Sequence, residues 1–262
     1  PICCPVSSQS QLPTVVLVCN FSLPPVLGME PECLMSHSEV ETLFHEFGHA
    51  LHSALSRTEF QHVSGTRGPA DFVEVPSHLL EYFCWDQRVV SQFARHFRTG
   101  EPPPAEMMAS LRRSKTLFAG METQTQILYA TLDQRLFGPQ PEGGVLSSTA
   151  ILEELQGQVT TIPHEPDTFW HSRFGHLTGY GATYYSYLYA RSLSSAIWER
   201  RFAKDPLNRR AGQRLWKQLL IHGSGRDPRR MLRDVMGPDK GEEAAVGALG
   251  PQGAMAVAAA EE

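Results

Sequence analysis

The stretch ETLFHEFGHALH, residues 41–52, decides how this chain is interpreted. Apolar residues in and around it recur every three to four positions, which is the spacing of one face of an α-helix. We predict a helix that starts at Ser38, because Ser38 and Glu41 match a capping box, and that ends near residue 55. Its apolar stripe consists of Val40, Leu43, Phe44, Phe47, Ala50, Leu51, Ala54 and Leu55.

The polar residues of this helix form the pattern HExxH. His45 and His49 are four residues apart, so both rings project from one face and can reach one metal ion. Glu46 follows the first histidine, where a carboxylate can serve as general base toward a metal-activated water. Glu41, one turn earlier, either orients a ligand histidine or only caps the helix. The alternative for the histidines is a solvated helix face, but the apolar stripe predicts burial, and buried histidines need partners.

A third ligand is needed, because a catalytic zinc takes three protein ligands and an open position. The extended pattern HExxHxxGxxH is excluded, since His52 stands in place of its glycine and Leu55 in place of its third histidine. Three glutamates remain within reach, namely Glu59, Glu74 and Glu81. We favour Glu74, which begins the next predicted helix after a loop long enough to fold it back, with Glu81 as the second choice. The simpler alternative for Glu74 is a helix-capping carboxylate.

A second group of polar residues lies in FGHLTGYGATYYSYLYARS, residues 174–192. Glycines interrupt this segment, and tyrosines crowd the point where it enters a helix. Phenols and a histidine beside a zinc centre can donate hydrogen bonds to the oxyanion of a tetrahedral intermediate. The alternative is that tyrosines at helical spacing are simply core residues.

The remaining chain predicts a mainly α protein with a small strand region near the N-terminus. The β-branched segment 12–21 predicts one buried strand. Periodic apolar residues predict further helices over 77–97, 105–137, 147–158, 184–203 and 211–222, separated by Gly- and Pro-rich breaks. Asp71 and Glu74 resemble a helix start that Pro76 must shift or kink. We divide the chain into an N-terminal strand and loop region, 1–36, a catalytic portion, 37–226, and an Ala/Gly-rich tail, 227–262, that we expect to be disordered.

Composition narrows the function classes. The 262 residues are 41% hydrophobic, which suits a protein with a packed core, and the net charge of −5 is spread without long runs of one sign. Because the charge is spread in this way, we expect no nucleic-acid partner. We also expect no membrane insertion, because the longest apolar run, near residues 15–18, is too short to span a bilayer. Five cysteines without CxxC pairs favour free thiols over a disulfide framework.

The two polar segments together resemble the M3 peptidases, the thimet oligopeptidase-like zinc enzymes. The resemblance is carried by HEFGHALHSALSRTEFQHVSGTRGPADFVEVPS and RFGHLTGYGATYYSYLYARS, and it extends from about residue 11 to 226. It implies a zincin-like helical catalytic domain with one Zn²⁺, held by His45, His49 and Glu74, and Glu46 as general base. It also implies that His176, Tyr180 and Tyr187 contact substrate or oxyanion, with Tyr184 as a neighbour in the same role.

Within that family, the chain is most similar to the branch that processes mitochondrial precursors, because the loop between His176 and Tyr180 is one residue shorter than in the thimet type. The resemblance then implies removal of N-terminal octapeptides from imported, unfolded precursors in the mitochondrial matrix. It also implies that the N-terminal half of such an enzyme is a missing partner of this chain. The alternatives are a cytosolic oligopeptidase that degrades short peptides, and a truncated, non-catalytic product that binds zinc or peptide.

Overall fold

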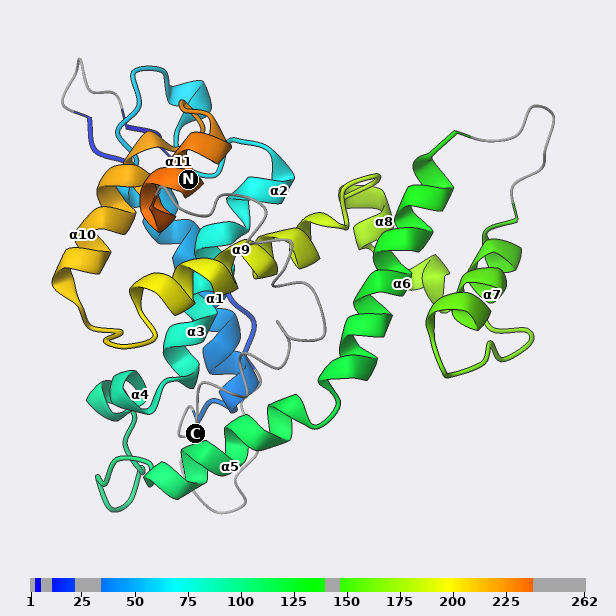
Figure 1. The fold of residues 1–262 in the computed structure, drawn as a ribbon, viewed down its shortest axis with the longest axis horizontal. Coiled ribbons are helices and arrows are strands. Elements are labelled where there is room, and N and C mark those ends of the chain that lie inside the picture. The colour runs from blue at the N-terminus through cyan, green and yellow to red at the C-terminus, as the bar shows by residue number, and fades with distance from the viewer. Residues whose placement is uncertain (1–2, 6–10, 22–33, 140–146, 238–262) are drawn as a thin grey trace.

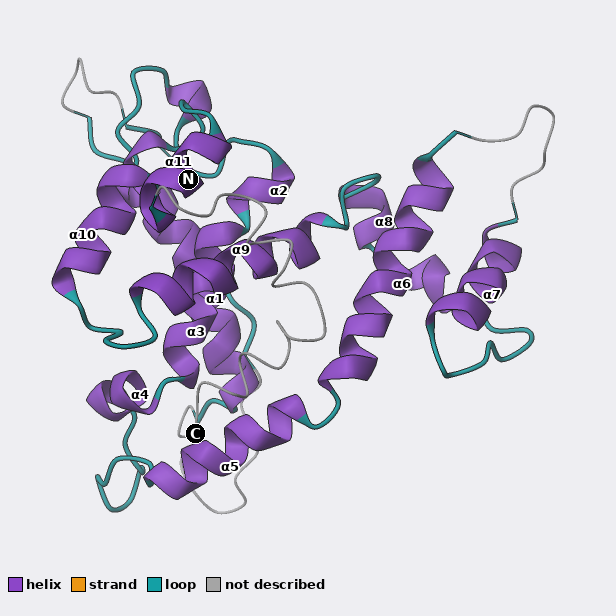
Figure 2. Cartoon of the chain, viewed as in Figure 1, coloured by secondary structure: helices purple, strands orange, loops and turns teal. Residues whose placement is uncertain are grey.

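The structure is a computed structural model that describes residues 3–5, 11–21, 34–139 and 147–237. The described part is mainly helical, and Figure 2 shows helices joined by loops without a strand in it. Its longer helices are α1 (His37–Leu55), α3 (Val75–Trp85), α5 (Ala105–Thr116), α6 (Ala119–Phe137), α7 (Ser148–Val159), α9 (Ser186–Arg201), α10 (Arg209–Gln218) and α11 (Pro228–Met236). Short helices between them are η2 (Gln61–Val63), α2 (Ala70–Val73), α4 (Gln87–Phe93), η3 (Trp170–Arg173), α8 (His176–Gly179) and η4 (Leu220–His222). Among the described helices, none has both the length and the hydropathy needed to cross a membrane.

The N-cap of helix α1 lies two residues earlier than the sequence pattern predicts. Ser36 is the N-cap: its Oγ accepts from the Glu39 amide, and the Glu39 carboxylate accepts from the Ser36 amide at 2.7 Å. Ser38 and Glu41 have the same spacing but lie inside the helix, so the predicted capping box is corrected to Ser36 and Glu39. Two serines, each followed by a glutamate at the third position, give the same local signal, so the sequence pattern alone does not distinguish them.

Helices α1 and α3 lie against each other so closely that their backbones touch at Gly48. A Cβ on Gly48 would stand 2.5 Å from Ser77 Cα and 2.8 Å from Pro76 O, which is too close for any side chain. Helix α9 packs on α3 in turn, as Figure 1 shows for the left part of the molecule. The glycine in the HExxH segment therefore brings α3 within reach of the histidines of α1.

The main core lies around α3 and α9 and extends to the C-terminal helices. It contains buried residues of α2, α3, α9, α10 and α11, and its largest fully buried side chains are Phe72, Leu79, Leu193, Ile197, Leu219 and Met231. At roughly 25 cal/mol per Å² of apolar area removed from water, each such side chain contributes about 1.5–3 kcal/mol. This core fixes the face of α3 that looks toward α1.

A second, smaller core joins α6 and α7. It consists of Leu128 and Leu132 of α6 with Leu152 and Leu155 of α7. Figure 1 shows α5 leading along the lower edge of the molecule into α6, which rises beside α8 and α7 on the right. The chain thus has two packed regions, and the candidate functional residues come from both.

The predicted strand over 12–21 is not formed. Cys3 and Thr14 make an isolated antiparallel bridge, and no further ladder joins the described residues around them. Leu12, Val16 and Val18 are exposed rather than buried. A strand is stable only when neighbouring strands pair with its backbone, and within the described residues only this bridge does so.

Two predicted helices are each divided. The helix predicted over 77–97 becomes α3 and α4, because Asp86 adopts extended backbone and caps α4 by accepting from the Arg88 amide at 2.8 Å. The helix predicted over 105–137 becomes α5 and α6, with a break at Leu117 and Phe118. Periodicity continues across both breaks, so the sequence pattern alone does not separate these helices.

The C-terminal boundary of the packed chain lies beyond the predicted one. Residues 228–236, which we assigned to a disordered tail, form α11, and Met231, Leu232, Val235 and Met236 are buried in the main core. Asp227 caps this helix, and Pro228 occupies its first turn. Residues 238–262, the rest of the predicted tail, lie outside the described residues.

Candidate metal centre

His45, His49 and Glu74 converge on one point. The two histidines come from α1, and Glu74 is the single residue between α2 and α3. Glu74 Oε2 lies 3.4 Å from His45 Nε2 and 3.3 Å from His49 Nε2. Glu74 also makes no side-chain cap of α3, so the alternative of a purely capping carboxylate is not supported.

The donor atoms suit a tetrahedral zinc ion. Ligands held about 2.0–2.1 Å from a tetrahedral zinc are separated from one another by about 3.3–3.4 Å. The distances from Glu74 Oε2 to the two Nε2 atoms agree with that edge length. In addition, His49 Nδ1 is buried without a hydrogen-bond partner among the described residues. Two imidazoles and one carboxylate are the ligand set of many catalytic zinc sites.

The electrostatics of the site keep Glu74 ionised. Burial alone would raise the pKa of Glu74, but hydrogen bonds and charge from His45 and His49 outweigh burial and hold this pKa far below its usual range. Burial likewise opposes the charging of His45, but Glu74 and Glu81 raise its pKa to about 9. The site therefore gathers negative charge around nitrogen donors, which is an environment that favours a bound cation.

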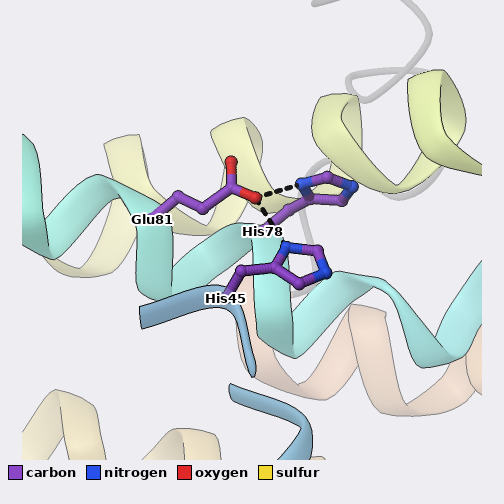
Figure 3. A group of neighbouring side chains, drawn as sticks. All are labelled: His45, His78 and Glu81. Carbon is purple, nitrogen blue, oxygen red and sulfur yellow. Dashed lines mark hydrogen bonds and ion pairs between the residues drawn. The ribbon is translucent and has the colours of Figure 1, made fainter. Parts of the chain in front are cut away.

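Glu81 accepts hydrogen bonds from two histidines. Its Oε1 lies 2.6 Å from His45 Nδ1 and 2.8 Å from His78 Nδ1 (Figure 3). Glu81, the second choice for the third ligand, thus faces the far nitrogen of His45 rather than the convergence point. The sequence analysis did not single out His78. Residues 74, 78 and 81 are three polar residues along one face of an apolar helix. This spacing is the sequence signal that indicates His78.

The other two glutamates weighed in the sequence lie elsewhere. Glu59 is exposed and belongs to neither group of clustered metal-binding side chains in the described residues. Glu41 accepts from Trp85 Nε1 at 2.8 Å and pairs with Lys115, so it does not orient His45. That prediction is corrected, because the positioning contact to His45 comes from Glu81 on the neighbouring helix.

Glu46 is half-buried on α1 directly after His45. Slight burial and the charge of Glu46 both raise the pKa of the Cys19 thiol. Cys19 in the segment 11–21 therefore lies within electrostatic range of Glu46. This carboxylate is not tied into the Glu74 and Glu81 contacts and remains available for proton transfer.

Asp133 anchors the tyrosine-rich segment. It is fully buried in α6, and its two carboxylate oxygens each accept at 2.9 Å from the backbone amides of Ala182 and Tyr184. Ala182 has a positive φ of 62°, and Gln134 donates to its carbonyl at 2.8 Å. The sequence analysis missed Asp133, because its partners lie about fifty residues away along the chain.

Tyr187 connects the aromatic side chains of this segment to His78, which packs beside the candidate ligand His45. The Tyr187 ring lies 6.2 Å from that of His78 and 5.6 Å from that of Tyr180, and the exposed His176 ring is 5.9 Å away. Burial, a hydrogen bond with Tyr180 and the nearby Glu74 charge raise the pKa of Tyr187 far above its usual range. The Tyr187 phenol therefore keeps its proton at neutral pH and can act as a donor.

Tyr184 differs from the expectation for it. It is buried, burial raises its pKa to about 12, and its hydroxyl donates to Gln126 Oε1 at 3.0 Å. The Tyr184 hydroxyl is thus engaged with α6. Tyr184 links the segment to α6 through Gln126, whereas the substrate contacts expected of Tyr180 and Tyr187 stay predictions.

The helical fold and the cluster of His45, His49 and Glu74 define the chain as a candidate metalloprotein of the HExxH class. Residues 2–251 match peptidase family M3, and the chain belongs to this family.

Mitochondrial intermediate peptidases are among its relatives. The human protein of that name is 48% identical over 226 residues, which cover 86% of this chain and 31% of the human protein. The one from Arabidopsis thaliana is 46% identical over 232 residues, covering 88% and 32% of the two chains. The one from Malassezia globosa is 45% identical over 240 residues, covering 91% and 30%. The chain spans about a third of the length of these curated relatives.

Proposed function

We propose that this chain is the zincin-like catalytic portion of a zinc metallopeptidase that hydrolyses peptide bonds. The observation that carries the proposal is the separation of 3.3–3.4 Å between Glu74 Oε2 and the Nε2 atoms of His45 and His49, which suits a tetrahedral zinc. Membership of peptidase family M3 supports the same conclusion. His45, His49 and Glu74 would hold one Zn²⁺.

The chain's own residues divide the chemistry among them. A zinc ion, when bound, supplies a Lewis acid that polarises a carbonyl and lowers the pKa of a water molecule. Glu46 removes a proton from the attacking water and delivers it to the leaving amine. Tyr187 and Tyr180 donate hydrogen bonds to the carbonyl oxygen as it becomes an oxyanion, and His176 contacts the substrate beside them.

We infer that the substrates are unfolded precursor proteins in the mitochondrial matrix, from which N-terminal octapeptides are removed. The names of the relatives support a mitochondrial processing role over that of a cytosolic oligopeptidase. Incubation with a precursor that carries an octapeptide, beside a free peptide of the same sequence, tests this inference. Faster cleavage of the precursor is expected, whereas cleavage of the free peptide alone would favour the cytosolic type.

Replacement of Glu46 by Gln tests the catalytic proposal. The amide keeps the size of the side chain but cannot take up the proton, so zinc content should stay near that of wild type while hydrolysis falls by about 10²–10⁴-fold. Zinc content and cleavage of a quenched peptide are measured on the same preparations. Glu59→Gln removes an exposed carboxylate outside the site and serves as the matched control, with unchanged activity.

Two outcomes would contradict the proposal. Wild type that binds no zinc would remove the metal centre, and a Glu46→Gln variant that cleaves at the wild-type rate would remove the assigned base. Wild type that binds zinc but does not cleave would instead support the alternative of a non-catalytic zinc-binding product.

A further inference from the structure

His78 is a buried histidine that touches neither the convergence point of the metal ligands nor a substrate position. It lies on α3 with 3% of its surface exposed. Its ring packs edge-on against His45, with ring centres 5.0 Å apart, and edge-on against Tyr187 on α9 at 6.2 Å. Its Nδ1 lies 2.8 Å from Glu81 Oε1, the atom that also contacts His45 Nδ1 (Figure 3).

The hydrogen positions follow from the charge of Glu81. An ionised carboxylate only accepts hydrogen bonds, so each imidazole must present an N–H at Nδ1. For His78 the other tautomer would set a nitrogen lone pair against the carboxylate and would bury an N–H at Nε2, which has no partner among the described residues. For His45, a proton on Nδ1 leaves Nε2 as the nitrogen that faces Glu74 and His49 and that would bind the metal ion.

Glu81 needs a second contact to hold its place. It carries several rotatable bonds, and its side chain is 18% exposed, so His45 alone does not define its direction. The His78 side chain is only 4% exposed and is enclosed by aromatic rings on two sides. The His78 side chain is therefore held firmly on α3. Its contact with Glu81, which in turn contacts His45, links it to α1.

We propose that His78 is a positioning residue that fixes the Glu81 carboxylate and, through it, the ring orientation of the metal ligand His45. The inference rests on the proposed zinc centre. It predicts that loss of the Nδ1 donor at position 78 weakens metal binding, although residue 78 contacts no metal. Outer partners of metal ligands typically change metal affinity by about 10–100-fold.

Two variants of His78 separate positioning from packing. His78→Leu has a similar size but no donor, whereas the amide nitrogen of His78→Asn can occupy the place of Nδ1 and still donate to Glu81. Zinc affinity is measured by competition with a chelator, and the visible absorption spectrum of the Co²⁺-loaded protein reports the ligand geometry. His78→Leu should lose about tenfold or more in zinc affinity and show a changed Co²⁺ spectrum. His78→Asn should restore both.

A buried histidine that is hydrogen-bonded to α7 provides the matched control. His171 in η3 is also buried, and its Nε2 makes a 3.0 Å hydrogen bond with Ser148 Oγ, far from the metal ligands in the chain. His171→Leu should lower the thermal midpoint of the metal-free protein without changing zinc affinity. If His78→Leu lowers stability as well, the effect of each variant on zinc affinity still distinguishes the two positions.

A double-variant cycle with Glu81→Gln keeps the proposal testable even if His78→Leu is poorly stable. If His78 acts through Glu81, His78→Leu should cost little further zinc affinity once Glu81 is Gln. Full additivity of the two losses would overturn the inference, as would wild-type zinc affinity and an unchanged Co²⁺ spectrum in His78→Leu. Wild type without zinc affinity would overturn both the inference and the zinc centre, so the two failures are distinguishable.

Discussion

His52 lies one turn beyond His49 and is completely buried. Its ring stands edge-on to Phe72 at 6.4 Å, and neither ring nitrogen has a hydrogen-bond partner among the described residues. Burial lowers the pKa of His52 to about 4, with the His49 charge acting in the same direction and the nearby Gly223 backbone opposing it only in part. The folded protein therefore holds this histidine in its neutral form.

This burial makes stability depend on pH in a defined direction. The unfolded chain protonates His52 near its ordinary pKa of 6.5, whereas the folded chain does so only near 4. Neutral His52 thus makes its full contribution to the unfolding free energy above pH 6.5, and this contribution is lost as the pH falls from 6.5 to 4. Between pH 7.5 and pH 5, wild type should lose about 2 kcal/mol of unfolding free energy relative to His52→Leu, which does not titrate.

Urea unfolding of metal-free wild type and His52→Leu at both pH values measures this difference. Other titrating groups are common to both proteins and cancel in the comparison. A stability difference that stays constant between the two pH values would show that the folded protein tolerates a charged His52.

At the level of single residues, the sequence identified the two histidines and Glu46, because a spacing of four on one helix defines their common face. For the third candidate ligand the sequence left Glu59, Glu74 and Glu81 within reach, with Glu74 favoured and Glu81 as the second choice. The path of the chain between α1 and α2 decides among them, and that path depends on distant contacts. The backbone amide of Arg57 donates to the Ile221 carbonyl at 2.7 Å, and that of Ser224 donates to the Val63 carbonyl at 2.7 Å. The chain in and just after η4 therefore shapes the loop. No local pattern records those contacts.

At the level of helices, the close approach of α1 and α3 depends on Gly48. The atoms that a Cβ would meet belong to the backbone of Pro76 and Ser77, so no side-chain rotation can relieve the clash. Gly48→Ala must push the two helices apart, and we expect a loss of about 1–3 kcal/mol or more in unfolding free energy. The same shift separates Glu74 from His45 and His49, so zinc affinity should fall as well.

Thermal unfolding and zinc titration of Gly48→Ala check this expectation. Gly212→Ala in α10 is the matched control, because a Cβ there meets no atom of the described residues within 4 Å. That control should gain about 0.5–1 kcal/mol, as Ala usually does over Gly inside a helix. Equal effects of the two substitutions would contradict the close packing of α1 on α3.

Helix type was predictable where apolar periodicity is strong, but helix ends were not. The breaks at Asp86 and at Leu117 with Phe118 fall inside continuous periodic segments. Asp86 is a capping residue only because the chain turns there, and Arg88 reinforces the turn by donating to the carbonyls of Ala203 and Lys204. The segment 12–21 shows the opposite case, because its strand propensity finds no partner among the described residues beyond the single bridge between Cys3 and Thr14.

At the level of the whole molecule, the two cores differ in size. The core shared by α3, α9, α10 and α11 buries many large side chains, whereas the α6 and α7 core rests on four leucines. Regions with fewer buried apolar contacts open at lower free energy than the main core. We expect backbone amides of α7 to exchange about tenfold or more faster than those of α9.

Hydrogen exchange followed by mass spectrometry measures this difference. Peptides from α3 and α9 report the main core, and peptides from α7 report the smaller one. Equal protection of α7 and α9 would mean that the two cores unfold as one cooperative unit.

Asp133 is hydrogen-bonded to the tyrosine-rich segment, so a tilt of α6 moves that segment with it. Asp133 lies fifteen residues beyond the break at Phe118, which is about 22 Å along a helix at 1.5 Å per residue. A tilt of about 5° at that corner carries Asp133 through about 2 Å, and the amides of Ala182 and Tyr184 travel with it. The angle between α5 and α6 at Leu117 and Phe118 therefore affects the position of the Tyr180 phenol, which we propose as a substrate contact.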